Sequence, residues 1–154
     1  MEWTGGCLCG AIRYEASEPP NKSGICHCRN CQQWTGSAYW AFTGFPLSAF
    51  RFTKGEPKVY RSSPIGDRGF CPDCGSSLTL HYLESLGEDA KSGPDHIWVA
   101  IGTLDHPEAV SLNYHYAVET QLPWVKFDDD LPRTRMNEDP GLEAAYGTAE
   151  RKAN

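Results

Sequence analysis

The sequence predicts a mainly β fold, a single small domain of short antiparallel sheets built around metal sites and carrying few short helices. Three observations support this prediction. Many short strand-like runs are separated by Gly, Pro, Ser and Asp, no long stretch has a helical period, and all seven cysteines fall into three tight clusters. The absence of strands alternating with long helices makes a parallel βαβ organisation unexpected.

The strand-like runs can be followed along the chain. After the glycine-rich turn at residues 4–10, Ile12 and Tyr14 alternate with polar neighbours, as in a half-exposed strand. We expect a loop from Ser17 to Gly24, an extended segment from Ile25 to Cys28, and one helical turn from Arg29 to Trp34. The later predicted strands are Ala38–Phe42, Phe50–Thr53, Lys58–Arg61, Leu78–Tyr82, Ile97–Ile101 and Tyr114–Val118.

Length and composition indicate one folded domain. The chain has 154 residues, of which 40% are hydrophobic and 22% charged, which is enough apolar material for one core. Beyond Asp128 the sequence becomes acidic and then polar, and Gly141 to Lys152 could form a short helix with Leu142 and Tyr146 on one side. We interpret Asp128-Asp129-Asp130 as a solvated acidic turn.

Charge and hydropathy exclude several partners. A net charge of -6, with no run of five basic residues, argues against a nucleic acid and an anionic membrane surface. The longest apolar run, Ile97 to Ile101, is too short to span a bilayer. Residues 1–4 lack the basic start of a signal peptide, so we expect a cytoplasmic protein. Because the cytosol keeps thiols reduced, metal binding explains the seven cysteines better than disulfides do.

The cysteine clusters have the spacings of metal ligands. They are Cys7-x-Cys9, Cys26-x-Cys28-x-x-Cys31 and Cys71-x-x-Cys74. In an extended segment, residues two apart point to one face, which predicts paired sulfurs for the first cluster and for Cys26 with Cys28. The third cluster, followed by Gly75, has the spacing of a zinc knuckle.

The number of cysteines favours one division into two zinc sites. A closed structural zinc takes four ligands and a catalytic zinc keeps three, which assigns Cys7, Cys9, Cys71 and Cys74 to a closed site. The remaining ligands, Cys26, Cys28 and Cys31, then form an open, labile site that would carry the catalysis. A division that splits one of the pairs is less economical.

Two other interpretations of the three-cysteine cluster stay open. The cluster could be a structural site closed by a histidine. His27 would point to the opposite strand face, which leaves His81, His96 or His115. Redox chemistry by the C-x-x-C motif is the second, although no thioredoxin-like βαβ pattern surrounds it.

Together these motifs resemble the glutathione-dependent formaldehyde-activating enzyme family, which includes centromere protein V. The motifs, in chain order, are Gly6-Cys7-Leu8-Cys9-Gly10, Cys26-His27-Cys28-Arg29-Asn30-Cys31, Thr35-Gly36-Ser37, Phe70-Cys71-Pro72-Asp73-Cys74-Gly75-Ser76, Gly102-Thr103-Leu104-Asp105, Pro123-Trp124 and Leu131-Pro132. The resemblance implies a zinc-binding domain over residues 1–132, followed by a polar tail over 133–154. It also implies a β-sheet fold with one structural and one labile zinc, the same division that the counting favours.

The resemblance further implies a carbon–sulfur lyase of the S-(hydroxymethyl)glutathione synthase type, acting on a small-molecule adduct of a glutathione-like thiol and an aldehyde such as formaldehyde. A three-thiolate zinc would accept a further sulfur, because coordination deprotonates a thiol. The alternative is a non-catalytic zinc scaffold that binds a protein partner, and homodimerisation stays open. Arg29 could receive a carboxylate, Ser37 could line a pocket, and His115 could act as an acid or base, although packing or solvent exposure explains each equally well or better.

Overall fold

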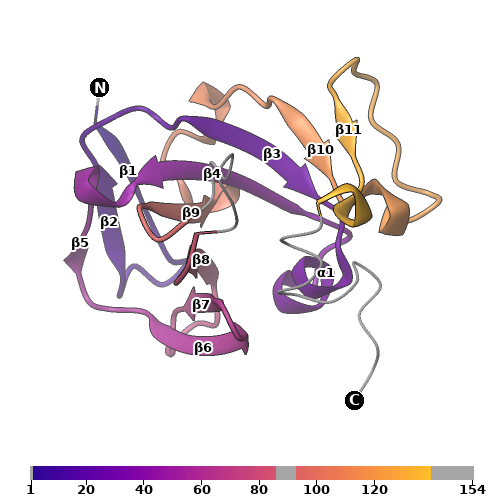
Figure 1. Cartoon of the computed structure of the whole chain (residues 1–154). Coiled ribbons are helices and arrows are strands. Elements are labelled where there is room, and N and C mark those ends of the chain that lie inside the picture. The colour runs from indigo at the N-terminus through magenta and orange to yellow at the C-terminus, as the bar shows by residue number, and fades with distance from the viewer. Residues whose placement is uncertain (1, 86–92, 140–154) are drawn as a thin grey trace.

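The computed structural model describes residues 2–85 and 93–139, and it confirms the predicted fold class (Figure 1). The described residues form two β-sheets and one α-helix, α1 (Arg29–Thr35), with short 3₁₀ helices in the connections. The strands are β1 (Trp3–Gly6), β2 (Arg13–Ala16), β3 (Lys22–Cys26), β4 (Trp40–Pro46), β5 (Phe50–Lys54), β6 (Lys58–Ser63), β7 (Gly66–Phe70), β8 (Ser77–Tyr82), β9 (His96–Ala100), β10 (Tyr114–Tyr116) and β11 (Arg133–Thr134). The 3₁₀ helices are η1 (Leu47–Ala49), η2 (Ile101–Thr103), η3 (Pro107–Ala109), η4 (Val118–Thr120) and η5 (Met136–Glu138).

The smaller sheet has three antiparallel strands in the order β1-β2-β5. Its strands alternate as the sequence predicts: Tyr14 and Ala16 of β2 are buried, whereas Arg13 and Glu15 lie at its other face. Arg13 pairs with Asp105, which also accepts a hydrogen bond from Thr4, and this ties the sheet to the segment after β9.

The larger sheet has eight strands in the order β11-β10-β3-β4-β9-β8-β7-β6. Pairing is antiparallel from β3 to β6, but β10 runs parallel to both β3 and β11. The long connection from β9 lets β10 return beside β3 in the same direction. Tyr116 thereby comes level with Cys26, the last residue of β3.

Two differences from the predicted elements have a common cause. Lys22–Gly24, expected in a loop, forms the first half of β3, and β7, which was not predicted, contains two glycines and two charged residues. Each segment is held by a neighbouring strand on both sides, so pairing overrides weak local preference. Gly24 also suits its position, because a Cβ there would lie 2.8 Å from the carbonyl oxygen of Tyr114.

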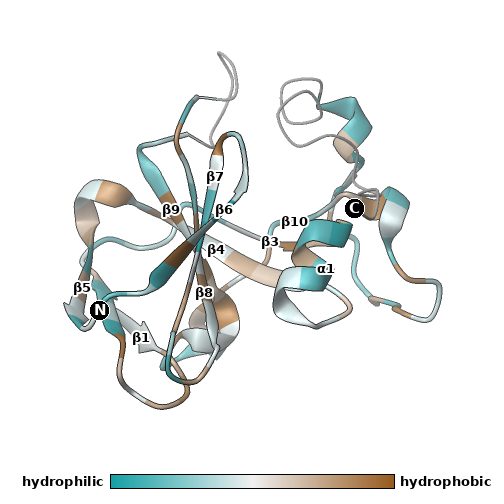
Figure 2. Cartoon of the chain, turned by 90° about the horizontal axis from the view of Figure 1, so that it is seen from below, coloured by the Kyte–Doolittle hydropathy of each residue, from teal (hydrophilic) through white to brown (hydrophobic). Residues whose placement is uncertain are grey.

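The core consists of two clusters of buried side chains. One contains Cys7 and Cys71 with Tyr14, Phe45 and Leu78, beneath the smaller sheet. The other contains Cys26, Cys28 and Cys31 with aromatic residues of β4, β9 and β10. In Figures 1 and 2, α1 lies on the opposite side of the molecule from β1 and β5. The two cysteine groups therefore belong to different parts of the core.

The C-terminal segment continues the larger sheet. β11 pairs with β10 and Met136 is buried in the second core cluster. The helix predicted over Gly141 to Lys152 lies outside the described residues, and the division of the chain at residue 132 stays a prediction. Among residues 2–85 and 93–139, no helix is long and apolar enough to cross a membrane.

Candidate functional site

Four cysteines meet where the two sheets approach each other. Cys7 and Cys9 lie in the connection between β1 and β2, and Cys71 and Cys74 lie in the turn between β7 and β8. The four sulfurs all lie within 4.8 Å of one another. Segments more than sixty residues apart, with Cys9 and Cys71 sulfurs at 3.8 Å, thus form one group.

Both segments reach the group through tight turns closed by glycine. Gly75 has φ +78° and donates its N–H to the Cys71 carbonyl, and Gly10, at φ +76°, does the same to Cys7. The chain turns at Cys7 to Gly10, as the glycine-rich motif predicts, so the extended geometry invoked to pair Cys7 with Cys9 does not apply there, although their sulfurs lie 3.6 Å apart. N–H and O–H groups surround the sulfurs, including the Ile12 N–H at 3.2 Å from Cys7 Sγ. Hydrogen bonding with Ser76 lowers the pKa of Cys74 to about 6.

The other three cysteines lie where β3 leads into α1. Cys26 ends the strand, Cys28 is the N-cap of the helix and Cys31 lies in its first turn, with the Cys31 N–H donating to Cys28 Sγ at 3.4 Å. All three are buried, with their sulfurs within 4.8 Å of one another. Within the described part of the chain, no fourth Cys, His, Asp or Glu joins this group.

A buried arginine that belongs to none of the sequence motifs contacts this group. Arg68 on β7 is 2% exposed, and its guanidinium nitrogens lie 3.7 and 3.8 Å from Cys31 Sγ. Its guanidinium also lies over the Trp34 ring at 4.8 Å, and its Nε donates to Ser62 Oγ. A buried cation beside sulfur favours the thiolate form.

The ionisation of the three thiols reflects this contact. The neighbouring sulfurs of Cys26 and Cys28, together with Arg68, hold the pKa of Cys31 well below its usual range. The neighbouring sulfurs of Cys28 and Cys31, with burial, raise the pKa of Cys26. Only the Cys31 sulfur thus favours the thiolate form by itself, and ionising all three buried thiols requires a cation among them. The donor set therefore fits a soft divalent ion such as zinc.

A cavity of about 100 Å³ opens directly on the three sulfurs. Its walls come from β3, β4, β7, β8, β9, β10 and the segment around η5. The lining side chains besides the cysteines are Lys22, Trp40, Phe42, Arg68, Leu80, Tyr82, Trp98, Tyr114, Tyr116, Met136 and Asp139. The aromatic residue Trp40, which the sequence assigns to the core, is both a core residue and a wall of this cavity.

Three residues that line the cavity each carry a polar atom with no hydrogen-bond partner among the described residues. These atoms are the indole Nε1 atoms of Trp40 and Trp98 and the hydroxyl of Tyr116, all buried. Burial also raises the pKa of Tyr116 above its usual range, so this hydroxyl keeps its proton. Buried donors in folded proteins are nearly always paired. These three would be satisfied by a ligand or water in the cavity.

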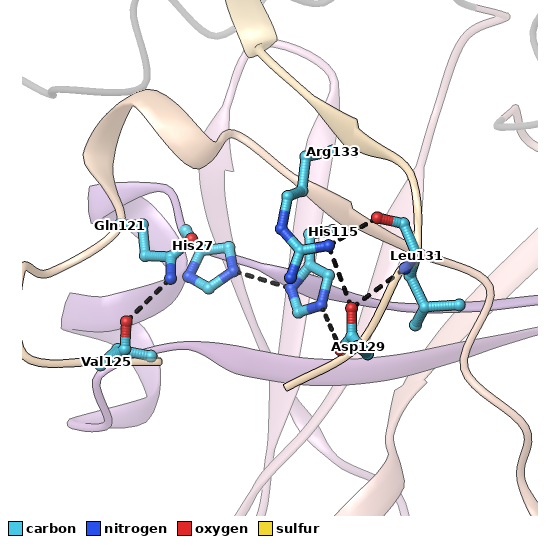
Figure 3. A network of polar contacts seen from close by, with 7 residues as sticks. All are labelled: His27, His115, Gln121, Val125, Asp129, Leu131 and Arg133. Atoms are coloured by element: carbon cyan, nitrogen blue, oxygen red, sulfur yellow. Dashed lines mark hydrogen bonds and ion pairs between the residues drawn. The ribbon is translucent and has the colours of Figure 1, made fainter. Parts of the chain in front are cut away.

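Behind the three cysteines, His27 begins a buried chain of polar groups (Figure 3). Its Nε2 lies 3.1 Å from His115 Nδ1, and His115 Nε2 lies 2.9 Å from an oxygen of Asp129. The Asp129 carboxylate accepts from His115 Nε2–H, and one further hydrogen bond joins His115 Nδ1 to His27 Nε2. His27 thus points away from the cavity, as the strand geometry predicts.

Asp129 anchors this chain and corrects the expectation of a solvated acidic turn. Its carboxylate also pairs with Arg133 at 3.0 Å and accepts the Leu131 N–H (Figure 3). The hydrogen bond from His115 lowers the pKa of Asp129. From the other side, Gln32 and Thr120 both donate to the His27 carbonyl, at 2.7 and 2.9 Å. The backbone between Cys26 and Cys28 is therefore held on both sides.

The remaining residues that the sequence singled out lie away from the sulfurs of Cys26, Cys28 and Cys31. Arg29 donates to Gln32, and Ser37 lies on a separate, open surface hollow near Cys74. His81 contacts the Pro94 carbonyl and His96 contacts Asn21. None of the three histidines proposed to close the site lies with the three sulfurs.

The fold and the two cysteine groups define a small β protein able to hold two metal ions in unlike environments. Residues 2–120 match the model of the glutathione-dependent formaldehyde-activating enzyme family, and the chain belongs to this family. A curated relative, an uncharacterized lyase of Schizosaccharomyces pombe, is 35% identical over 81 residues, which cover 53% of this chain and 58% of the relative. A solved structure of a Rhodobacter sphaeroides protein, a structural genomics target, covers 85% of this chain and 99% of its own at 20% identity and a TM-score of 0.48.

Proposed function

We propose that the protein is a zinc-dependent carbon–sulfur lyase or synthase that acts on adducts of a low-molecular-weight, glutathione-like thiol and a small aldehyde. The observation that carries this proposal is a group of three buried cysteines with no fourth protein ligand in the described residues, opening on a cavity. Family membership and the lyase name of the fission-yeast relative support the reaction class.

The proposal assigns two zinc ions per chain. Cys7, Cys9, Cys71 and Cys74 would hold a closed, structural ion, since four thiolates complete a tetrahedron. Cys26, Cys28 and Cys31 would hold the second, labile ion. When bound, that ion would supply an electrophilic position that favours the thiolate form of a substrate thiol. Arg68 offsets the formal charge of about -1 that three thiolates and one divalent ion carry.

The chain's own residues would assist the carbon–sulfur chemistry. In synthesis the thiolate sulfur attacks the carbonyl carbon, the C–S bond forms, and the electron pair of the C=O bond moves to oxygen, which then takes a proton. The reverse reaction breaks the C–S bond and returns the proton. Trp40 Nε1, Trp98 Nε1 and the Tyr116 hydroxyl are donors on the cavity wall that would stabilise the developing negative charge on that oxygen.

The proposal also covers the domain boundary, the class of substrate and the cellular location. We propose residues 1–132 as the zinc-binding domain and 133–154 as a C-terminal extension of it. The substrates would be small molecules and not nucleic acid or membrane, because the net charge is -6. A cytoplasmic location suits seven reduced thiols.

Exchange spectroscopy by NMR tests the function directly. Zinc-loaded protein is added to glutathione and formaldehyde at equilibrium, and the rate of interconversion between S-(hydroxymethyl)glutathione and its components is measured. We expect acceleration that Cys31→Ser abolishes. Thiol binding without acceleration, across several thiols and aldehydes, would overturn the lyase assignment in favour of the protein-binding scaffold.

A further inference from the structure

The cavity beside Cys26, Cys28 and Cys31 is built mainly of apolar and aromatic side chains. Trp40 and Phe42 come from β4, Trp98 from β9 and Tyr114 from β10. These rings pack on one another, with Phe42 against Trp98 at 5.3 Å and edge-on, and Phe42 against Tyr114 at 5.8 Å. Such a surface gains binding free energy from apolar area removed from water.

The size of the cavity limits what can enter it. A water needs roughly 10–15 Å³, so about 100 Å³ is space for roughly seven to ten waters or for one small ring. Pockets for drug-sized ligands are about 300–1,000 Å³. A tripeptide thiol therefore does not fit inside as a whole, and the one carbon of formaldehyde would leave most of the space unfilled.

The polar groups of the cavity are arranged in a gradient. Lys22 and Asp139 are half-buried, whereas Trp40 and Trp98 are 4% and 3% exposed. Lys22 and Asp139 thus lie on the better-exposed part of the wall, with Lys22 Nζ over the Tyr114 ring at 4.4 Å. The third charged group, Arg68, is buried, and its guanidinium is engaged by Cys31 Sγ, Ser62 Oγ and the Trp34 ring. The deeper wall offers aromatic carbon and the indole groups of Trp40 and Trp98, whose Nε1 atoms have no partner in residues 2–85 and 93–139. An apolar ligand with one oxygen acceptor would suit this wall.

We propose that this cavity receives the aldehyde-derived half of the substrate, and that this half is an aromatic or branched aliphatic aldehyde the size of one ring. The inference rests on the proposed lyase function and narrows its substrate class. The ring packs among Trp40, Phe42 and Trp98, and the aldehyde oxygen, a hydroxyl in the adduct, accepts from the indole donors. The thiol sulfur reaches the three cysteines from the same cavity, and the polar remainder of the thiol lies toward Lys22.

The test compares aldehydes on one preparation of zinc-loaded, full-length protein. Glutathione is mixed in turn with formaldehyde, 2-methylpropanal and benzaldehyde, and NMR exchange gives the acceleration of each adduct over its protein-free rate. We expect an acceleration at least about tenfold larger for benzaldehyde than for formaldehyde, since one well-placed apolar group gives roughly tenfold to two-hundredfold discrimination.

A matched pair of substitutions on β4 tests the cavity itself. Phe42 lines the cavity, whereas Phe45, three residues further, is buried in the other core cluster. Phe42→Leu should lower the benzaldehyde-to-formaldehyde ratio about fivefold or more, and Phe45→Leu should leave it unchanged. The ratio is taken within one sample, so partial unfolding of a variant does not alter it.

The outcomes separate this inference from the function on which it rests. Two results would overturn the assignment of an aromatic aldehyde and leave the lyase function standing. One is equal acceleration of the formaldehyde and benzaldehyde adducts, and the other is an equal change of their ratio in Phe42→Leu and Phe45→Leu. Acceleration of no aldehyde would overturn the lyase function, and this inference with it.

Discussion

The two cysteine groups use the same ligand chemistry in opposite structural settings. The group of Cys7, Cys9, Cys71 and Cys74 joins two turns from different sheets, and Cys9 is exposed. The group of Cys26, Cys28 and Cys31 comes from one continuous segment of six residues, is buried throughout, and faces a cavity. A metal in the first group would cross-link the fold, whereas a metal in the second would only complete a local loop that the protein already holds.

The two cysteine groups also differ in the residues that surround them. The sulfurs of the four-cysteine group lie among hydrogen-bond donors, the Ile12 N–H and the Ser76 hydroxyl, as is typical of a zinc knuckle. Arg68 contacts the three-cysteine group, and Gln32, Thr120 and His115 fix its backbone. The number of ligands thus matters less to folding than which segments the ligands connect.

The largest expected effect is on folding. Cys71→Ser should remove the cross-link between the sheets and leave no cooperative unfolding transition at 25 °C, because a structural zinc contributes about 10–16 kcal/mol and a domain has about 5–15 kcal/mol of stability. Cys31→Ser should keep native circular dichroism and a cooperative melt. If Cys31→Ser unfolds the protein as thoroughly, both groups are structural and the comparison fails.

The next effect is on metal retention. Protein purified without chelators should contain two zinc ions, and a competing chelator at equilibrium should remove one of them at far lower concentration, because three ligands bind less tightly than four. Elemental analysis during the titration gives the two affinities. One firmly held ion, with no second site on adding zinc, would contradict the open site.

Replacing the buried Arg68 should lower the zinc affinity of the three-cysteine group and leave that of the four-cysteine group unchanged. Arg68→Met removes the cation beside Cys31 Sγ and should lower zinc affinity there about 10–100-fold, the usual effect of losing an outer partner of a metal ligand. Arg61→Met is the matched control, since Arg61 lies on the neighbouring strand β6 and pairs with Asp67 at the surface. Equal losses in both variants, measured by chelator competition, would show that Arg68 acts only through general stability.

How far the sequence predicts this structure depends on the range of the interactions. Three features follow from spacing and local geometry, and the structure has all of them. They are the grouping of all seven cysteines, the helix after Cys28, and the direction of the His27 side chain away from the three-cysteine group. The role of the cysteines as zinc ligands stays a prediction. Arg68 could not be recognised, because its contact with Cys31, 37 residues away, arises only when β7 packs beside α1. Asp129 could not be recognised, because its contact with buried His115 depends on how the connection after β10 folds back. β7 and the parallel pairing of β10 were missed for the same reason.

The smallest effect concerns the buried chain behind the second group. Asp129→Asn should lower the free energy of unfolding by urea by a small but measurable amount, because Asp129 is partly exposed and solvent screens its interactions. Its pKa is lowered in the native state, so its contribution is complete above the unfolded pKa of about 3.9 and is lost only as pH falls through the native value.

The cost of Asp129→Asn should accordingly stay constant between pH 5 and pH 8. Asp128→Asn, at an exposed neighbouring position, should cost nothing measurable. A cost that fades within this pH range would contradict the assigned hydrogen bond between His115 and the Asp129 carboxylate.

Cobalt substitution tests most directly the claim that only the second group accepts a thiol. Protein with cobalt in both sites should have thiolate charge-transfer absorption that increases on adding glutathione, because a fourth sulfur joins the ion held by Cys26, Cys28 and Cys31. The increase should saturate at one thiol per chain and should vanish in Cys31→Ser. An absorption unchanged by glutathione and by other small thiols would mean that the site is closed, and it would contradict the proposed function.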